Sequence, residues 1–222
     1  TYARVSRYGV VAYASSFDQV GPIAKTVEDA ALILEVIAGN DEHDSTSSPT
    51  VVAPYAQLLS DDAPKKIAYI KETLDSDGLD PEIKENVLHQ IAQLKAKGHT
   101  VEPVSFEYLD YVVATYYILT TAEASSNLAR YDGVHYGYRS PNATDLMSTY
   151  KKSRSEGFGE EVKRRIMLGT FVLSAGYYDA YYAKAQKARR LIKEKMDEIL
   201  SQYDFIITPT TPTPAFNIGE QI

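Results

Sequence analysis

The sequence contains no cysteine and no tryptophan, and only three methionines among 222 residues. Without cysteine the chain cannot form disulfides, bind a metal through thiolates or use a cysteine nucleophile. No apolar run approaches the roughly 20 residues that span a bilayer, and no signal peptide is visible at the start. Lys and Arg number 23 against 30 Asp and Glu, a net charge of −7, which argues against a broad phosphate-binding face.

Two helix boundaries are clearly marked. Thr26 and Asp29 form a capping-box-like start, and apolar residues then recur on one face until Gly39, which is a typical residue after a helix end. Asp80 followed by Pro81 is a second helix start, and its apolar stripe continues to Gly98. We therefore predict two amphipathic helices, with a polar loop over 40–50 after the first.

The second helix lies between two strand candidates, Lys66–Ile70 and Thr100–Ser105. Strand, helix and strand in this order predict a βαβ unit with a parallel pair. Pro103 interrupts the second strand, which favours a position at the sheet edge because proline cannot donate to a ladder.

The rest of the chain alternates helical and aromatic segments. We predict helices over Tyr108–Arg130, Glu160–Ser174 and Tyr178–Tyr203, an aromatic loop over Tyr131–Arg139 and a buried strand at Phe205–Thr208. No element is assigned between 139 and 157. Three strands with at least five helices indicate the α/β class.

Two local patterns suggest chemistry, and neither is convincing. Ser148 and Lys151 fit a serine activated by a lysine one helical turn away, but such a match is expected by chance and its companion motifs are absent. Three carboxylates and an imidazole occupy residues 41–44, yet adjacent side chains diverge, so a solvated polar loop is favoured over a metal site. No phosphate-binding glycine loop or HExxH occurs. We therefore predict no catalytic, cofactor-binding or metal-binding residue from these patterns.

Tyrosine is the unusual abundance, with 18 residues. Four of them cluster at Tyr177, Tyr178, Tyr181 and Tyr182. We interpret this cluster as core packing, with stacking on nucleobases as the alternative. The basic run Lys184–Lys195 is interpreted as a solvated helix face.

Longer segments resemble a known family. SSFDQVGPIAKTVEDAA is similar to the pattern of the amidase-signature family of amide hydrolases. AEASSNLARYDGVHYG and EEVKRRIMLGTFVLSAGYYDAYYAKA resemble, within that family, the A subunit of tRNA-dependent amidotransferases. Ala3 is a departure, because the family usually has glycine there. The resemblance implies an amidase-signature fold, a mixed β-sheet core covered by helices. It also implies that residues 1–222 are a single part of one larger amidase domain, with the catalytic N-terminal part and the extreme C-terminus outside them.

The resemblance assigns two substrate-binding residues. Tyr116 matches a tyrosine that contacts glutamine, and Arg165 matches an arginine that holds the substrate's α-carboxylate, a group that a guanidinium grips with two parallel hydrogen bonds. Tyr116 as one more packed tyrosine, and Arg164 as the recognising arginine, are the alternatives. The family's catalytic lysine and two serines match no residue of this chain.

The resemblance further implies an activity. The intact protein would hydrolyse glutamine and pass ammonia to a B subunit, which uses ATP and Mg to convert Glu-tRNA(Gln) to Gln-tRNA(Gln). A C subunit would complete a cytoplasmic heterotrimer that meets tRNA through the B subunit and has no membrane contact. Residues 1–222 alone are then expected to be inactive. Another amidase-signature hydrolase, or a non-catalytic binding module, is the alternative.

Overall fold

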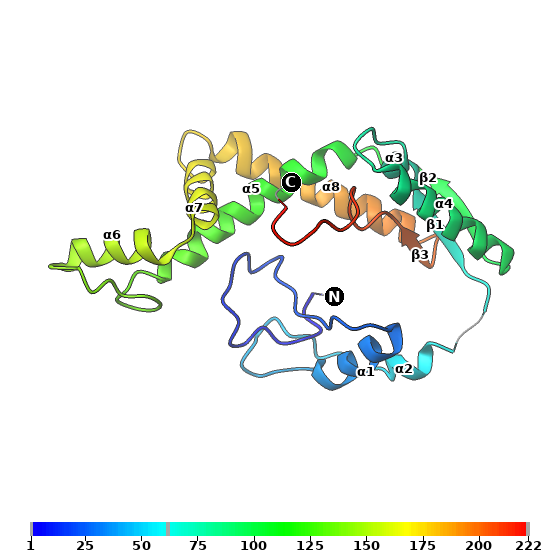
Figure 1. Cartoon of the computed structure of the whole chain (residues 1–222), viewed down its shortest axis with the longest axis horizontal. Helices are drawn as coiled ribbons and strands as arrows, with labels where there is room; N and C mark the ends of the chain where they lie inside the picture. Colours follow the sequence, from blue (N-terminus) through cyan, green and yellow to red (C-terminus); the bar gives the residue numbers. More distant parts are fainter. Residues whose placement is uncertain (1, 61–62, 221–222) are drawn as a thin grey trace. The chain divides into compact units, whose positions relative to one another are not determined.

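The computed structural model describes residues 2–60 and 63–220. The chain divides into two compact units, which we call the helical unit (Thr1–Asp61 with Tyr116–Gln186) and the sheet unit (Asp62–Thr115 with Lys187–Ile222). Helices α5 (Leu109–Asn127) and α8 (Ala183–Leu200) contribute residues to both units (Figure 1). Each unit is described by itself below.

The sheet unit is built on three parallel strands. They are β1 (Lys66–Ile70), β2 (Thr100–Val104) and β3 (Phe205–Ile207), in the order β2-β1-β3. Between β1 and β2 lie the short α3 (Lys71–Leu74) and the long α4 (Pro81–Ala96). The parallel βαβ unit, the final strand and the edge position of the strand that contains Pro103 are confirmed.

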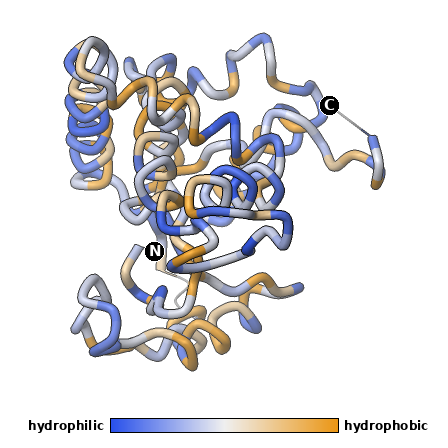
Figure 2. The backbone as a smooth tube through the Cα atoms, turned by 90° about the vertical axis from the view of Figure 1, so that its left-hand side faces the viewer, coloured by the Kyte–Doolittle hydropathy of each residue, from blue (hydrophilic) through white to orange (hydrophobic). Residues whose placement is uncertain are grey.

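The two faces of β1 enter two different clusters, because successive strand residues point to opposite sides. Ile67 packs with residues of α3, α4 and β2, among them the buried Ile91. Ala68 and Ile70 pack on the other face against Phe106 and Ile199 of α8. The helices that cover these faces show the recurring hydrophobic positions that such packing requires (Figure 2).

The helical unit has no strands among its described residues. It contains α1 (Val27–Ile37), α2 (Tyr55–Leu58), the second half of α5, a 3₁₀ turn (Leu128–Arg130), α6 (Leu146–Gly157), α7 (Glu160–Val172) and a π turn (Tyr178–Tyr182). The predicted start of α1 is confirmed, since the Thr26 hydroxyl accepts the Asp29 N–H at 3.0 Å. Within the described parts of the chain, no helix has the length and apolarity needed to cross a membrane.

Helix α6 is an element that the sequence analysis leaves unassigned. It begins with a reciprocal cap, in which Asp145 accepts the Ser148 N–H at 2.8 Å and the Ser148 hydroxyl meets the Asp145 N–H at 2.9 Å. Ser148 is therefore a capping residue, which explains its serine-to-lysine spacing without catalysis.

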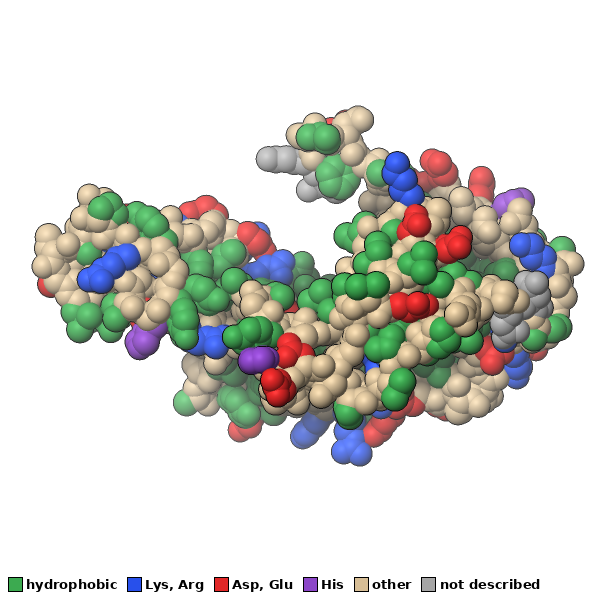
Figure 3. All heavy atoms as spheres, turned by 90° about the horizontal axis from the view of Figure 1, so that it is seen from below, with side chains coloured by type: hydrophobic (Ala, Val, Ile, Leu, Met, Phe, Trp, Pro, Cys, Tyr) green, Lys and Arg blue, Asp and Glu red, His purple; other side chains and the backbone are tan. Residues whose placement is uncertain are grey.

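The core-packing interpretation of the tyrosine cluster is wrong for three of its four members. Tyr177, Tyr178 and Tyr181 are 41–44% exposed. Instead of entering a core, Tyr177 and Tyr181 stack around Phe171 of α7, with ring centroids 4.2 and 5.9 Å from it. Hydrophobic side chains, tyrosines included, are visible over much of the surface in Figure 3. The predicted helix from Tyr178 also differs, because its first turn is a π turn and α8 proper starts at Ala183.

Ala3 has a left-handed backbone, with φ of +67°. This conformation costs a residue with a Cβ about 1–2 kcal/mol, and it is held here by the Ser48 N–H, which donates to the Ala3 carbonyl at 2.8 Å. We expect Ala3→Gly to raise the free energy of unfolding by about 0.5–1 kcal/mol in urea titrations, since glycine adopts this φ without strain. Ala143→Gly, at a loop residue whose φ is not positive, should lower it instead. Equal effects at both positions would contradict the prediction.

Candidate functional site

Arg165 is the half-buried cation of the helical unit. It lies on α7, where its Nη1 donates to the Tyr13 hydroxyl at 2.8 Å and its Nε donates to Glu161 Oε1 at 2.8 Å. The guanidinium carbon also lies 5.7 and 5.6 Å from the ring centroids of Tyr13 and Tyr117. Aromatic rings and a carboxylate therefore fix the orientation of the guanidinium before any ligand arrives.

Tyr116 lies beside this arginine. Its ring meets Phe17 edge-on at 6.3 Å and neighbours Tyr117 at 5.4 Å. The Tyr13 hydroxyl most strongly, and the Tyr116 hydroxyl as well, raise the pKa of Arg165, while burial opposes them. The structure thus brings together the two residues that the sequence analysis assigned to substrate binding.

The neighbouring arginine does not share this environment. The Arg164 side chain is 77% exposed and pairs with Glu161 from the solvent side, whereas that of Arg165 is 24% exposed. Of the two, only Arg165 is presented among the tyrosines, so the geometry favours it as the recognising residue.

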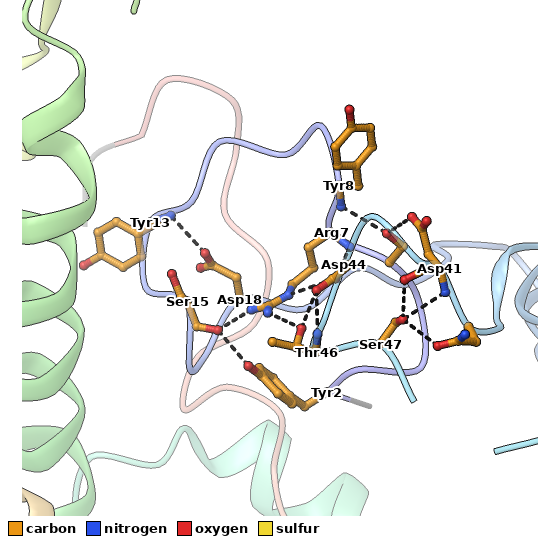
Figure 4. Close-up of polar contacts among 12 residues, drawn as sticks. Tyr2, Arg7, Tyr8, Tyr13, Ser15, Asp18, Asp41, Asp44, Thr46 and Ser47 are labelled. Atoms are coloured by element: carbon orange, nitrogen blue, oxygen red, sulfur yellow. Dashed lines mark hydrogen bonds and ion pairs between the residues drawn. The ribbon is translucent and has the colours of Figure 1, made fainter. Parts of the chain in front are cut away.

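Tyr13 is a contact that sequence reasoning missed. It belongs to the 13–18 loop, whose turn is closed by Asp18: the carboxylate accepts the N–H groups of Tyr13 at 2.9 Å and of Ala14 at 3.0 Å (Figure 4). The Asn127 side chain donates to the Tyr13 carbonyl at 3.1 Å, and Glu123 accepts the Ser16 N–H at 2.9 Å. Helix α5 therefore anchors the loop that presents the Tyr13 hydroxyl to Arg165. Nothing periodic in the sequence marks Tyr13.

The 41–44 segment, considered above as a metal site, is instead tied to Arg7. The Arg7 N–H donates to Asp44 at 2.9 Å, and its guanidinium reaches Thr46 and the Ser15 carbonyl, so that it lies between two loops (Figure 4). Asp41 accepts the Ser6 hydroxyl at 2.5 Å. Within residues 2–60 and 63–220 there is no group of three side chains arranged to hold a metal ion. The carboxylates of this segment order the loops of the unit.

This network predicts a pH dependence. Hydrogen bonds from Thr46 and Arg7 lower the pKa of the Asp44 carboxyl to about 2. Because the folded pKa lies below the ordinary value, the stabilisation is fully present above about pH 4 and is lost as the pH falls through 2. We expect wild-type protein to lose stability more steeply than Asp44→Asn between pH 4 and pH 2, measured by near-UV circular dichroism. Asp77→Asn, at an exposed aspartate of the sheet unit, should follow wild type. Parallel curves for wild type and Asp44→Asn would refute the prediction.

An oriented, half-buried guanidinium among tyrosines is suited to a carboxylate ligand. Such a pair gains from charge-assisted hydrogen bonds in a setting where aromatic rings exclude water on one side. The partly exposed Tyr116 offers a hydroxyl to the same ligand. The arrangement is therefore a candidate binding site for a small molecule that carries a carboxylate.

Comparison with known proteins gives a consistent result. The family model described as Amidase matches residues 1–222. The A subunits of glutamyl-tRNA(Gln) amidotransferase from Oceanobacillus iheyensis and from Geobacillus thermodenitrificans are each 57% identical over 222 residues. These matches cover 100% of this chain and 45% and 46% of the relatives. The crystal structure of the same A subunit from Thermotoga maritima is similar with a TM-score of 0.74 at 43% identity, over 100% of this chain and 43% of that one. The chain thus spans about half the length of the relatives it matches, and it belongs to the amidase family.

Proposed function

We propose that this chain is the glutamine-holding part of a glutaminase, the A subunit of a tRNA-dependent amidotransferase. The observation that carries the proposal is the Arg165 guanidinium, held by Tyr13 and Glu161 beside Tyr116. The relatives from Oceanobacillus and Geobacillus, which bear the name of the glutamyl-tRNA(Gln) enzyme, support it.

Each of the two residues has a distinct role in the proposal. Arg165 binds the α-carboxylate of glutamine with two hydrogen bonds, and the Tyr116 hydroxyl contacts the same substrate and limits its freedom. An amide without an α-carboxylate would leave the guanidinium unpaired at a half-buried position, which is costly. The site therefore favours an amino acid over fatty-acid or aryl amides.

The chemistry of the proposal belongs to the longer protein. By resemblance, a serine outside residues 1–222 attacks the side-chain amide carbon, ammonia leaves, and water releases glutamate from the acyl-enzyme. Ammonia then serves a B subunit that uses ATP and Mg to amidate Glu-tRNA(Gln), with a C subunit completing a cytoplasmic complex. In this proposal the B subunit, rather than this chain, meets tRNA.

Ammonia release tests the proposal directly. The full-length gene product should release ammonia from glutamine at a rate proportional to enzyme, and residues 1–222 produced alone should release no more than a buffer blank. A full-length protein that hydrolyses simple aryl amides and not glutamine would refute the substrate assignment. Activity from residues 1–222 alone would refute the placement of the nucleophile.

Tyr13→Phe should weaken glutamine binding without slowing the chemical step. The change removes the hydroxyl that accepts from Arg165 and keeps the ring, so we expect the KM for glutamine to rise about fivefold, roughly 1 kcal/mol, with kcat unchanged. Tyr117→Phe is the matched control, because the Tyr117 ring faces the same guanidinium and should keep the wild-type KM. A wild-type KM in Tyr13→Phe would show that the hydroxyl does not position Arg165 for substrate.

A further inference from the structure

The helical unit contains a second candidate site, a groove of about 410 Å³ between α6 and α7. Phe158, Ile166 and Met167 supply its apolar surface, and Lys151 and Lys163 lie at its rim. No Asp or Glu lines it within the described residues. We call it the α6–α7 groove.

The apolar part of the groove is open to solvent. Met167 is 73% exposed, although it follows directly after the buried turn that holds Arg165. Exposed methionine is flexible and polarizable, and it is over-represented at protein-binding surfaces. Large apolar side chains gathered in a concave surface mark an interaction site better than the same residues scattered singly.

The rim carries uncompensated positive charge. Lys151 is exposed and has no ion pair within the described parts of the chain, while Lys163 pairs with Glu160 at 2.9 Å. Residues 139–172 contain seven Lys and Arg against four Asp and Glu, in a chain whose net charge is −7. The ligand that fits is therefore apolar in its centre and acidic at its edge.

The surface suits a protein segment better than RNA. Arg154 donates to the Leu128 carbonyl at 2.8 Å and lies 5.1 Å over the Phe158 ring. It thus covers the aromatic face on which a base would stack. Aliphatic carbons and flanking lysines match an amphipathic helix with carboxylates beside an apolar anchor.

We propose that the α6–α7 groove is the docking site for an amphipathic, carboxylate-bearing segment of a companion subunit. The proposal rests on the proposed function, because relatives that are each one lettered part of a named enzyme imply an assembly of several chains. Its place on α7 also has a consequence: the groove residues Ile166 and Met167 directly follow Arg165, so an occupied groove restrains the helix that carries the substrate-binding arginine.

The test uses the full-length protein and its purified companion subunits, with Kd measured by isothermal titration calorimetry. Met167→Asp should weaken assembly by about 100-fold and Lys151→Glu by about tenfold, because the first buries a carboxylate in the apolar groove and the second reverses the rim charge. The matched controls are Met147→Asp, at an exposed methionine of α6 outside the groove, and Lys152→Glu, whose ammonium donates to the Asn142 carbonyl at 2.6 Å. Both should stay within threefold of wild type.

Several results would overturn the inference. They are wild-type assembly by both groove variants, loss of tRNA binding without loss of subunit binding, and a dimer of this chain that Met167→Asp dissolves. A cysteine placed by Lys151→Cys should react with maleimide in the free protein and be protected in the complex. Failure to react in the free protein would mean that the protein's own chain covers the groove, which also overturns it. Glutamine hydrolysis is measured in parallel, so that failure of the proposed function and failure of the groove are separate outcomes.

Discussion

Replacing Arg165 by methionine should lower kcat/KM for glutamine in the full-length protein by about 100- to 1,000-fold. Losing a charge-assisted, two-point contact with a carboxylate costs about 3–4 kcal/mol when the site is partly desolvated, and each 1.4 kcal/mol is a factor of ten. Arg165→Lys should recover only part of this loss, because an ammonium cannot make two parallel hydrogen bonds to one carboxylate. Steady-state ammonia release over a range of glutamine concentrations measures the effect.

The adjacent Arg164 provides the control. Arg164→Met makes the same change of charge and shape one residue away, at a side chain that is mostly exposed and bound to Glu161. It should keep kcat/KM within about twofold of wild type, since exposed ion pairs contribute little. Equal losses in the two variants would show that net charge on α7, and not the position of one guanidinium, governs substrate binding. Near-UV circular dichroism of both variants separates a binding defect from a folding defect.

The second large effect is expected at Gly169, one helical turn after Arg165 on α7. A Cβ on Gly169 would overlap the Thr121 carbonyl oxygen of α5 and come within 2.8 Å of the Ser125 Cβ. The Thr121 atoms belong to the backbone of a buried turn, so a side-chain rotation cannot relieve the clash. Gly169→Ala should therefore lower the free energy of unfolding by about 3 kcal/mol or more, as overpacking against a rigid backbone does.

Urea unfolding of the full-length protein tests this prediction against Gly176→Ala. Gly176 is a turn residue with no atom within 4 Å of an added Cβ, so its substitution should change the free energy of unfolding by less than about 0.5 kcal/mol. Adding Ser125→Gly to Gly169→Ala removes the side-chain contact and leaves the carbonyl contact, so it should restore only a small part of the loss. Full restoration would mean that the two helix backbones are not in contact there.

Much of the fold was predictable because its signals are local. The Thr26 cap, the Asp80–Pro81 start and the strand Lys66–Ile70 each depend on residues within a few positions of one another. Helix α6 escaped assignment because its sequence has few apolar residues, so its start at Asp145 is the main signal. Short-range chemistry thus fixes where elements begin, and weakly apolar elements remain hard to see.

The site was only partly predictable for the opposite reason. Family resemblance singled out Tyr116 and Arg165, and the structure brings them together. Tyr13 is 152 residues from Arg165 in sequence and meets it only in the folded unit, so no pattern of spacing reveals the contact. The exposure of Tyr177 and its neighbours was likewise invisible, because a tyrosine's composition signal is the same in a core and on a surface.

The anchored 13–18 loop has a consequence for exchanging segments between homologues. Arg165 is supplied by α7, but the hydroxyl that orients it comes from Tyr13, whose turn is closed by Asp18 and tied to Asn127 of α5. A chimaera that imports α7 alone inherits the arginine without its orienting hydroxyl if the recipient has phenylalanine at position 13. Recombination that respects this unit must move three separate stretches together, the 13–18 loop, the second half of α5 and α7. Crossover points placed between them should yield folded proteins with poor glutamine affinity.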